Sequence, residues 1–169
     1  MQLLLRFIAM VELVSPAGVA AWQTFLKAHA AAVGRIEIDF EDRGLIPLVW
    51  YDVLVAIQLA PDHRLRMMEL AGALMLTRSN ATRLVDRLET VGLIVRERLD
   101  GDRRGTVAVL TAAGRQALRR AWPVYARGIN EYFLTALSSG ELRTLAAALG
   151  KVQQQKRPVR PALKRRTSL

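Results

Sequence analysis

The stretch from Thr77 to Glu89 constrains the fold of this chain more than any other part of the sequence. One face of a helix over these residues would carry the apolar side chains of Ala81, Leu84, Val85 and Leu88. Their i, i+3, i+4, i+7 spacing predicts an α-helix that buries a narrow stripe against a small core. The other face is polar and cationic, and its members are Arg78, Ser79, Asn80, Thr82, Arg83 and Arg87. Taken alone, this pattern fits an ordinary amphipathic surface helix as well as a helix that binds DNA.

The polar face has the side chains that a helix in a DNA major groove needs. Arginine matches the hydrogen-bonding edge of guanine, asparagine matches that of adenine, hydroxyls suit either base, and all of them can bind phosphates. The preceding segment favours this interpretation, because a short helix is predicted over 67–74 and Thr77 is a suitable N-cap for the next helix. Two short helices joined by a tight turn form a helix-turn-helix pattern.

A β-hairpin is predicted directly after the second helix. Gly92 ends the helix, two strands are predicted over 93–99 and 106–110, and a charged turn over 100–105 joins them. This order of elements is a winged helix-turn-helix. The turn is rich in arginine, which suits the narrow, electronegative minor groove beside the major groove that the helix would occupy.

Over residues 22–153, and most specifically over 67–114, the chain resembles the MarR family of bacterial transcriptional regulators. The motifs that stand in the family's order and spacing are Glu69-Leu70-Ala71, Thr82-Arg83-Leu84-Val85-Asp86-Arg87-Leu88-Glu89, Gly92-Leu93-Ile94, Asp102-Arg103-Arg104 and Leu110-Thr111-Ala112-Ala113-Gly114. The resemblance implies a homodimer that binds a palindromic operator in double-stranded DNA, with recognition helices in successive major grooves and wings in the flanking minor grooves. Repression by blocking polymerase is the default that it implies. Met68 departs from the family, which often has a small or hydroxyl residue at this helix start, and this leaves the cap of the helix open.

The resemblance assigns DNA-binding roles to particular positions. The residues concerned are Thr77, Arg78, Ser79, Asn80, Thr82, Arg83, Arg87, Asp102, Arg103 and Arg104. Those on the helix would contact bases and phosphates. Arg103 or Arg104 would enter the minor groove, and Asp102 would orient one of them through a charge-assisted hydrogen bond.

The predicted fold is mainly α with a small β-hairpin wing. Outside the winged unit, helices are predicted from Val19 to near Gly44, over 48–59, from an N-cap at Thr111, and after the capping box Ser138-Ser139-Gly140-Glu141. The helix over 48–59 is apolar on nearly all sides, which implies that it is sandwiched in the core. Pro123 is expected to kink the helix that follows Thr111. The outer helices carry more apolar surface than the winged unit can cover, and a two-fold dimer would bury it.

The predicted organisation has four parts. They are an N-terminal extension over 1–18, a helical dimerisation region over 19–46 and 111–155, a winged helix-turn-helix domain over 47–110, and a basic disordered tail over 156–169. The apolar run in the extension is short and interrupted by charge, so we expect an extra helix or the product of an overextended start codon rather than a signal peptide. The tail is predicted to contact phosphates irrespective of sequence, and a solvated terminus is the alternative.

Composition limits the classes of function. A formal net charge of +10 and a pI near 11.1 favour a polyanionic partner, and DNA, an acidic membrane surface and an acidic protein all satisfy this condition. The chain has no cysteine, which excludes disulfides and thiolate sites and is compatible with the cytoplasm. His29 and His63 lack ligand-like neighbours, so neither a metal nor a cofactor is expected. No catalytic constellation is present either, and an enzyme is therefore not expected.

Members of the MarR family commonly lose DNA affinity when a small phenolic or aromatic-acid effector occupies the cleft between the dimer helices and the winged domain. The candidate ligand-binding residues here are Trp22, Trp50, Tyr51 and Asp52. In the alternative, the aromatic residues belong to the core and Asp52 is a cap or an ion-pair partner. Two other functions stay open: an architectural DNA-binding protein without sequence preference, and a helical module that binds an acidic protein through its basic face.

Overall fold

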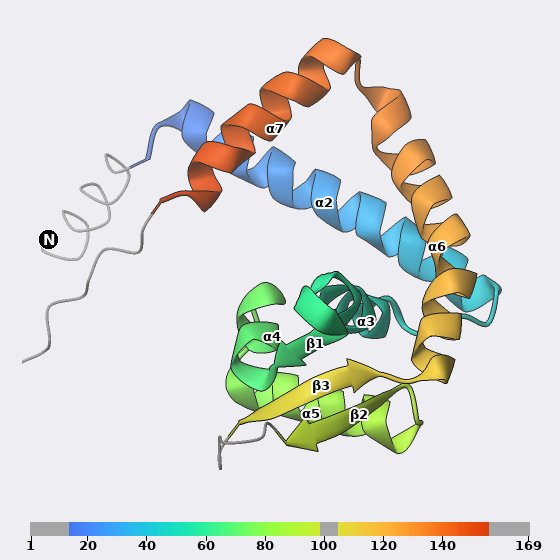
Figure 1. Cartoon of the computed structure of the whole chain (residues 1–169). Coiled ribbons are helices and arrows are strands. Elements are labelled where there is room, and N and C mark those ends of the chain that lie inside the picture. The colour runs from blue at the N-terminus through green and yellow to red at the C-terminus, as the bar shows by residue number, and fades with distance from the viewer. Residues whose placement is uncertain (1–13, 99–104, 156–169) are drawn as a thin grey trace, which may run out of the picture.

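The structure is a computed structural model, and it describes residues 14–98 and 105–155. Its elements in chain order are α2 (Pro16–Asp42), α3 (Leu48–Leu59), η1 (Pro61–His63), β1 (Arg64–Arg66), α4 (Met67–Ala73), α5 (Arg78–Thr90), β2 (Ile94–Arg98), β3 (Thr106–Leu110), α6 (Ala112–Tyr132), η2 (Leu134–Ala136) and α7 (Ser139–Gln153). Figure 1 shows the small sheet with α3, α4 and α5 on one side of the molecule, and α2, α6 and α7 on the other. The predicted fold, mainly helical with a small β wing, is confirmed.

The wing belongs to a three-stranded antiparallel sheet with the order β1-β3-β2. The two predicted wing strands are present and pair antiparallel, with Ile94 opposite Leu110 and Arg98 opposite Thr106, while positions 99–104 lie outside the described residues. The added strand β1 pairs with the other edge of β3 and was not predicted. Three residues are too few to show a strand pattern, and only the pairing with β3, some forty positions later in the chain, makes this segment a strand.

The winged unit has its own hydrophobic core. Its buried members are Val53, Leu54, Ile57, Leu70, Val85, Leu88, Ile94, Ala108 and Leu110. They come from α3, α4, α5, β2 and β3, so each element contributes its apolar side to one cluster. This packing holds α5 against the sheet (Figure 1), and the polar residues of the helix that lie opposite its buried side chains are exposed.

A second core lies between the long helices. It is formed by Ile36, Phe40, Leu48, Tyr51 and Ala121, which come from α2, α3 and α6. The helix α3 therefore has buried residues in both clusters, which confirms the prediction that it is sandwiched in the core. Because it belongs to both, α3 ties the winged unit to the long helices.

The ends of the long helices follow local sequence signals. The first of them, α2, begins at Pro16 rather than at the predicted Val19, because Ser15 caps it by accepting a hydrogen bond from the Gly18 N–H at 3.1 Å. The predicted N-caps Thr111 and Ser138 of α6 and α7 are confirmed. The α6 helix continues through Pro123. Among the described residues, no helix has the length and apolar character needed to cross a membrane.

Candidate nucleic-acid interface

The helix α5 is anchored by three side chains on one face. Ala81, Val85 and Leu88 are almost completely buried, and Leu84 is half-buried beside them. This is the predicted apolar stripe. Because the stripe occupies one side of the helix and is buried, the residues on the opposite side face solvent.

The two helices of the helix-turn-helix begin differently. The Oγ1 atom of Thr77 accepts a hydrogen bond from the Asn80 N–H at 3.3 Å, as the sequence predicts for an N-cap. At the start of α4, Oε2 of Glu69 accepts a hydrogen bond from the Arg66 N–H at 3.2 Å. Glu69 thus satisfies the N–H group of the cap residue, but the arginine side chain at the cap position cannot accept a hydrogen bond from the first-turn N–H groups of α4.

The face of α5 opposite the buried stripe carries Ser79, Asn80, Arg83 and Arg87, all of them exposed. The side chains of Asn80, Arg83 and Arg87 follow the i, i+3, i+7 spacing and so share one side of the helix. Within the described part of the chain, neither Arg83 nor Arg87 pairs with a carboxylate. Their guanidinium groups are therefore available to an external anion or to base edges.

Two predicted residues lie on the flanks of α5 instead. The Nη2 atom of Arg78 is 3.0 Å from Sδ of Met68 on α4. The hydroxyl of Thr82 donates to the Arg78 carbonyl at 2.9 Å. With its proton engaged in the helix, the Thr82 hydroxyl is left as an acceptor for a donor on a base or on water.

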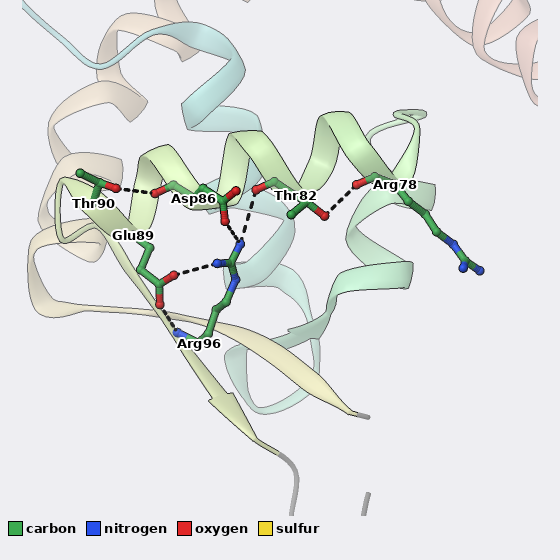
Figure 2. A network of polar contacts seen from close by, with 6 residues as sticks. All are labelled: Arg78, Thr82, Asp86, Glu89, Thr90 and Arg96. Carbon is green, nitrogen blue, oxygen red and sulfur yellow. Dashed lines mark hydrogen bonds and ion pairs between the residues drawn. The ribbon is translucent and has the colours of Figure 1, made fainter. Parts of the chain in front are cut away.

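A polar network that the sequence did not predict joins the wing to α5 (Figure 2). Arg96 extends from β2, and its Nη1 and Nη2 atoms reach Glu89 Oε2 at 2.9 Å and Asp86 Oδ1 at 2.6 Å. The Arg96 N–H also donates to Glu89 Oε1 at 3.1 Å, and Nη2 donates to the Thr82 carbonyl at 3.4 Å. The signal was in the strand: Arg96 stands two residues after buried Ile94, on the side where an apolar residue is expected.

The wing residues Asp102, Arg103 and Arg104 lie outside the described residues. The first wing strand, β2, ends at Arg98, and the second, β3, begins at Thr106. Roles in the minor groove for these three residues stay predictions.

The four predicted ligand-binding residues do not form one group within a single chain. Tyr51 is buried, with its ring 4.8 Å from that of Tyr125 and 5.6 Å from that of Phe40. Trp50 packs instead against the core of the winged unit. Trp22 lies near the start of α2, where its side chain is 60% exposed. The structure thus leaves Tyr51 and Asp52 near α2 and α6, and it separates them from Trp22.

The surroundings of Asp52 disfavour its ionised form. The residue is exposed as a whole, yet its carboxyl is partly desolvated, and this burial followed by the charge of Glu37 raises the pKa of Asp52. Burial, together with Tyr125 and Asp52, raises the pKa of Tyr51 to about 12. Both shifts have the direction expected for acidic groups that lose water without gaining a cation. Among the described residues, no His, Cys, Asp and Glu side chains gather in a group that could hold a metal ion.

Comparison with known proteins extends the resemblance. The sequence profile of the MarR family matches residues 43–105. Over 130 residues the chain is 33% identical to YkoM of Bacillus subtilis, an uncharacterized HTH-type transcriptional regulator. This match covers 77% of this chain and 82% of YkoM. Over 88 residues it is 35% identical to the transcriptional repressor MprA of Escherichia coli. That match covers 52% of this chain and 49% of MprA, so the chain spans about half the length of this relative.

A solved structure shares the whole arrangement. Sco3205, a MarR family transcriptional regulator from Streptomyces coelicolor that was crystallised in complex with DNA, superposes with a TM-score of 0.78 at 27% sequence identity. The superposition covers 86% of this chain and 95% of Sco3205. It therefore includes the long helices as well as the winged unit.

Proposed function

This chain belongs to the MarR family of transcriptional regulators, and from that premise we propose that it is a homodimeric repressor that binds a palindromic operator and is released by a small-molecule effector. Each part of this proposal rests on a different feature of the molecule.

The exposed face of α5 carries the proposal of sequence-specific binding. Asn80, Arg83 and Arg87 lie opposite the buried stripe, and the arginines have no carboxylate partner among the described residues. Residues near the N-terminus of a recognition helix contact base edges, so Ser79, Asn80 and Arg83 are assigned to bases. Arg87 lies farther along the helix and is assigned to a phosphate.

Exposed apolar side chains on the long helices support a homodimer. On α2 they are Val19, Trp22, Phe25, Leu26 and Ile38, and no residue of α7 is buried. A second copy related by a two-fold axis would cover these faces, since α2 and α7 lie away from the sheet (Figure 1). A two-fold protein matches a palindrome whose half-sites are separated by one helical turn, roughly 34–36 Å.

The remaining DNA contacts are proposed for segments outside the described residues. Arg103 or Arg104, oriented by Asp102, would enter the minor groove beside the half-site. The tail over 156–169 would bind phosphates irrespective of sequence.

The effector is proposed to bind near Tyr51 and Asp52, between α2, α3 and α6. An effector releases DNA only if it binds the DNA-incompetent arrangement more tightly than the competent one. This location suits that condition, because α3 belongs to both cores and a ligand beside it could change how the winged unit is held. A small phenolic or aromatic acid is the proposed class, and Trp22 and Trp50 would contribute only through rearrangement or a second copy.

Fluorescence anisotropy tests the proposal. The full chain is titrated against duplexes tiled over the region upstream of its own gene, with random duplex as competitor, at near-physiological salt. We expect tight binding to one palindrome-containing tile, which Arg83→Ala and Arg104→Ala should each remove. Equal and weak binding to every tile would instead identify an architectural protein. Failure to bind any duplex would favour the protein-interaction module.

A further inference from the structure

We propose that Arg96 is a positioning residue that connects the wing strand to the recognition helix and thereby sets how both meet DNA, without contacting DNA itself. The inference rests on the proposed function, because it assigns a role within the same DNA-binding surface. It concerns a residue that lies on β2, outside the set of predicted DNA contacts.

The contacts of Arg96 all go to one flank of α5. Its partners Thr82, Asp86 and Glu89 follow the i, i+4, i+7 spacing of a single helix edge. That edge lies between the buried stripe and the outer face with Arg83 and Asn80. Figure 2 shows the guanidinium group reaching along this edge from the strand. Rotation of α5 about its axis would break these contacts together, so the network adds to the buried stripe in fixing the direction in which the outer face points.

The geometry leaves Arg96 little freedom to bind phosphate. Its side chain is 26% exposed, and both ends of the guanidinium fork already contact carboxylates. A planar fork that binds two acceptors is held in one orientation, unlike the ammonium group of lysine. The backbone N–H of Arg96 also binds Glu89, so both the strand and its side chain are attached to the helix.

Charge gives the network a second effect. Asp86 and Glu89 place two carboxylates on a helix that must approach a polyanion. Because Arg96 stands against both of them, it lowers the repulsion that they would exert on DNA. Loss of Arg96 should therefore weaken binding through misorientation of the helix and through two uncompensated negative charges.

The first test uses the preferred tile from the titration above and a random duplex of equal length. Arg96→Ala is compared with Arg119→Ala, which removes one exposed positive charge from α6. We expect Arg96→Ala to lower the ratio of tile affinity to random affinity about ten-fold and to leave the salt slope unchanged. Arg96→Lys should restore little of the ratio, since it keeps the charge but not the fork. A salt slope reduced by about one would show a direct phosphate contact and overturn the proposal.

A second variant keeps the test valid if Arg96→Ala unfolds. The double substitution Asp86→Asn with Glu89→Gln preserves shape and removes two negative charges, so repulsion alone predicts tighter binding to every duplex. We expect a lower ratio of tile affinity to random affinity instead. An unchanged or higher ratio would overturn the positioning role.

Hydrogen exchange separates this inference from the proposed function. In the free protein, Arg96→Ala should increase amide exchange in α5 and β2 relative to Arg119→Ala, while exchange in α6 stays unchanged. Unchanged exchange in α5 would overturn the connection between strand and helix, whether or not the protein binds DNA. If the wild type does not discriminate among duplexes, the proposed function fails, and the exchange result still decides the connection.

Discussion

Gly128 on α6 lies directly against the side chain of Ile36 on α2. A Cβ atom at Gly128 would stand 2.6 Å from Cγ1 of Ile36, which is closer than two carbon atoms can approach without displacement. Both residues are buried. The close approach of these two helices, and hence the second core, depends on the missing side chain.

Gly128→Ala should therefore destabilise the protein by about 1–3 kcal/mol, because the added methyl group overpacks the contact with Ile36. Gly34→Ala is the matched control, since a Cβ at Gly34 on α2 would meet nothing within 4 Å. It should be neutral or stabilise the protein by up to about 1 kcal/mol, because alanine favours the helix. Chemical denaturation measures both, and equal effects of the two substitutions would contradict the proposed contact.

Thr77→Ala should cost about 1 kcal/mol of stability, because it removes the hydroxyl that accepts from the Asn80 N–H at the start of α5. Thr90→Ala at the other end of the helix removes a hydroxyl that donates to the Asp86 carbonyl and caps no free N–H group. Its effect should be smaller. Thermal unfolding of both variants makes the comparison, and a larger loss for Thr90→Ala would argue against the cap.

Arg87→Ala should weaken binding to the preferred tile and to random duplex by similar factors. A phosphate contact carries no sequence information, so its loss should affect every duplex alike. Because the variant neutralises one phosphate fewer, the magnitude of its salt slope should also fall by about one. Anisotropy titrations at several salt concentrations measure both quantities, with Arg119→Ala on α6 as the charge control. A loss confined to the preferred tile would place Arg87 on a base instead.

Asp52→Asn should stabilise the protein at neutral pH, by less than about 1 kcal/mol because water still screens the exposed part of the carboxyl. Burial and Glu37 raise the pKa of Asp52, so its ionised form is less favourable in the folded state than in the unfolded one. The folded state therefore holds this proton more tightly, and the cost appears as the pH rises through the raised pKa.

The advantage of Asp52→Asn should consequently fade as the pH falls toward 3.8, the ordinary pKa of the group, where both states are protonated. Thermal unfolding of the wild type and the variant over this range measures the difference. An advantage that grows on acidification would contradict the direction of the shift.

Local patterns were sufficient for the elements that carry their own signals. The helical spacing of Ala81, Val85 and Leu88 predicted both the helix α5 and its exposed face, and the Thr77 hydroxyl marked where it begins. Two β-rich runs on either side of a charged segment likewise predicted the paired strands β2 and β3. These predictions succeeded because capping and helical or strand periodicity act over a few residues.

Contacts between distant segments decided the rest. The strand β1 exists only because β3 pairs with it, and Arg96 acquires its role only when β2 lies beside α5. Two adjacent aromatic residues pack in different cores: Tyr51 lies in the core between the long helices, whereas Trp50 packs against the core of the winged unit. The sequence alone thus determined the helices, the two wing strands β2 and β3, and which α5 residues face solvent. Tertiary structure decided which side chains meet, because packing energy depends on neighbours that no local pattern contains.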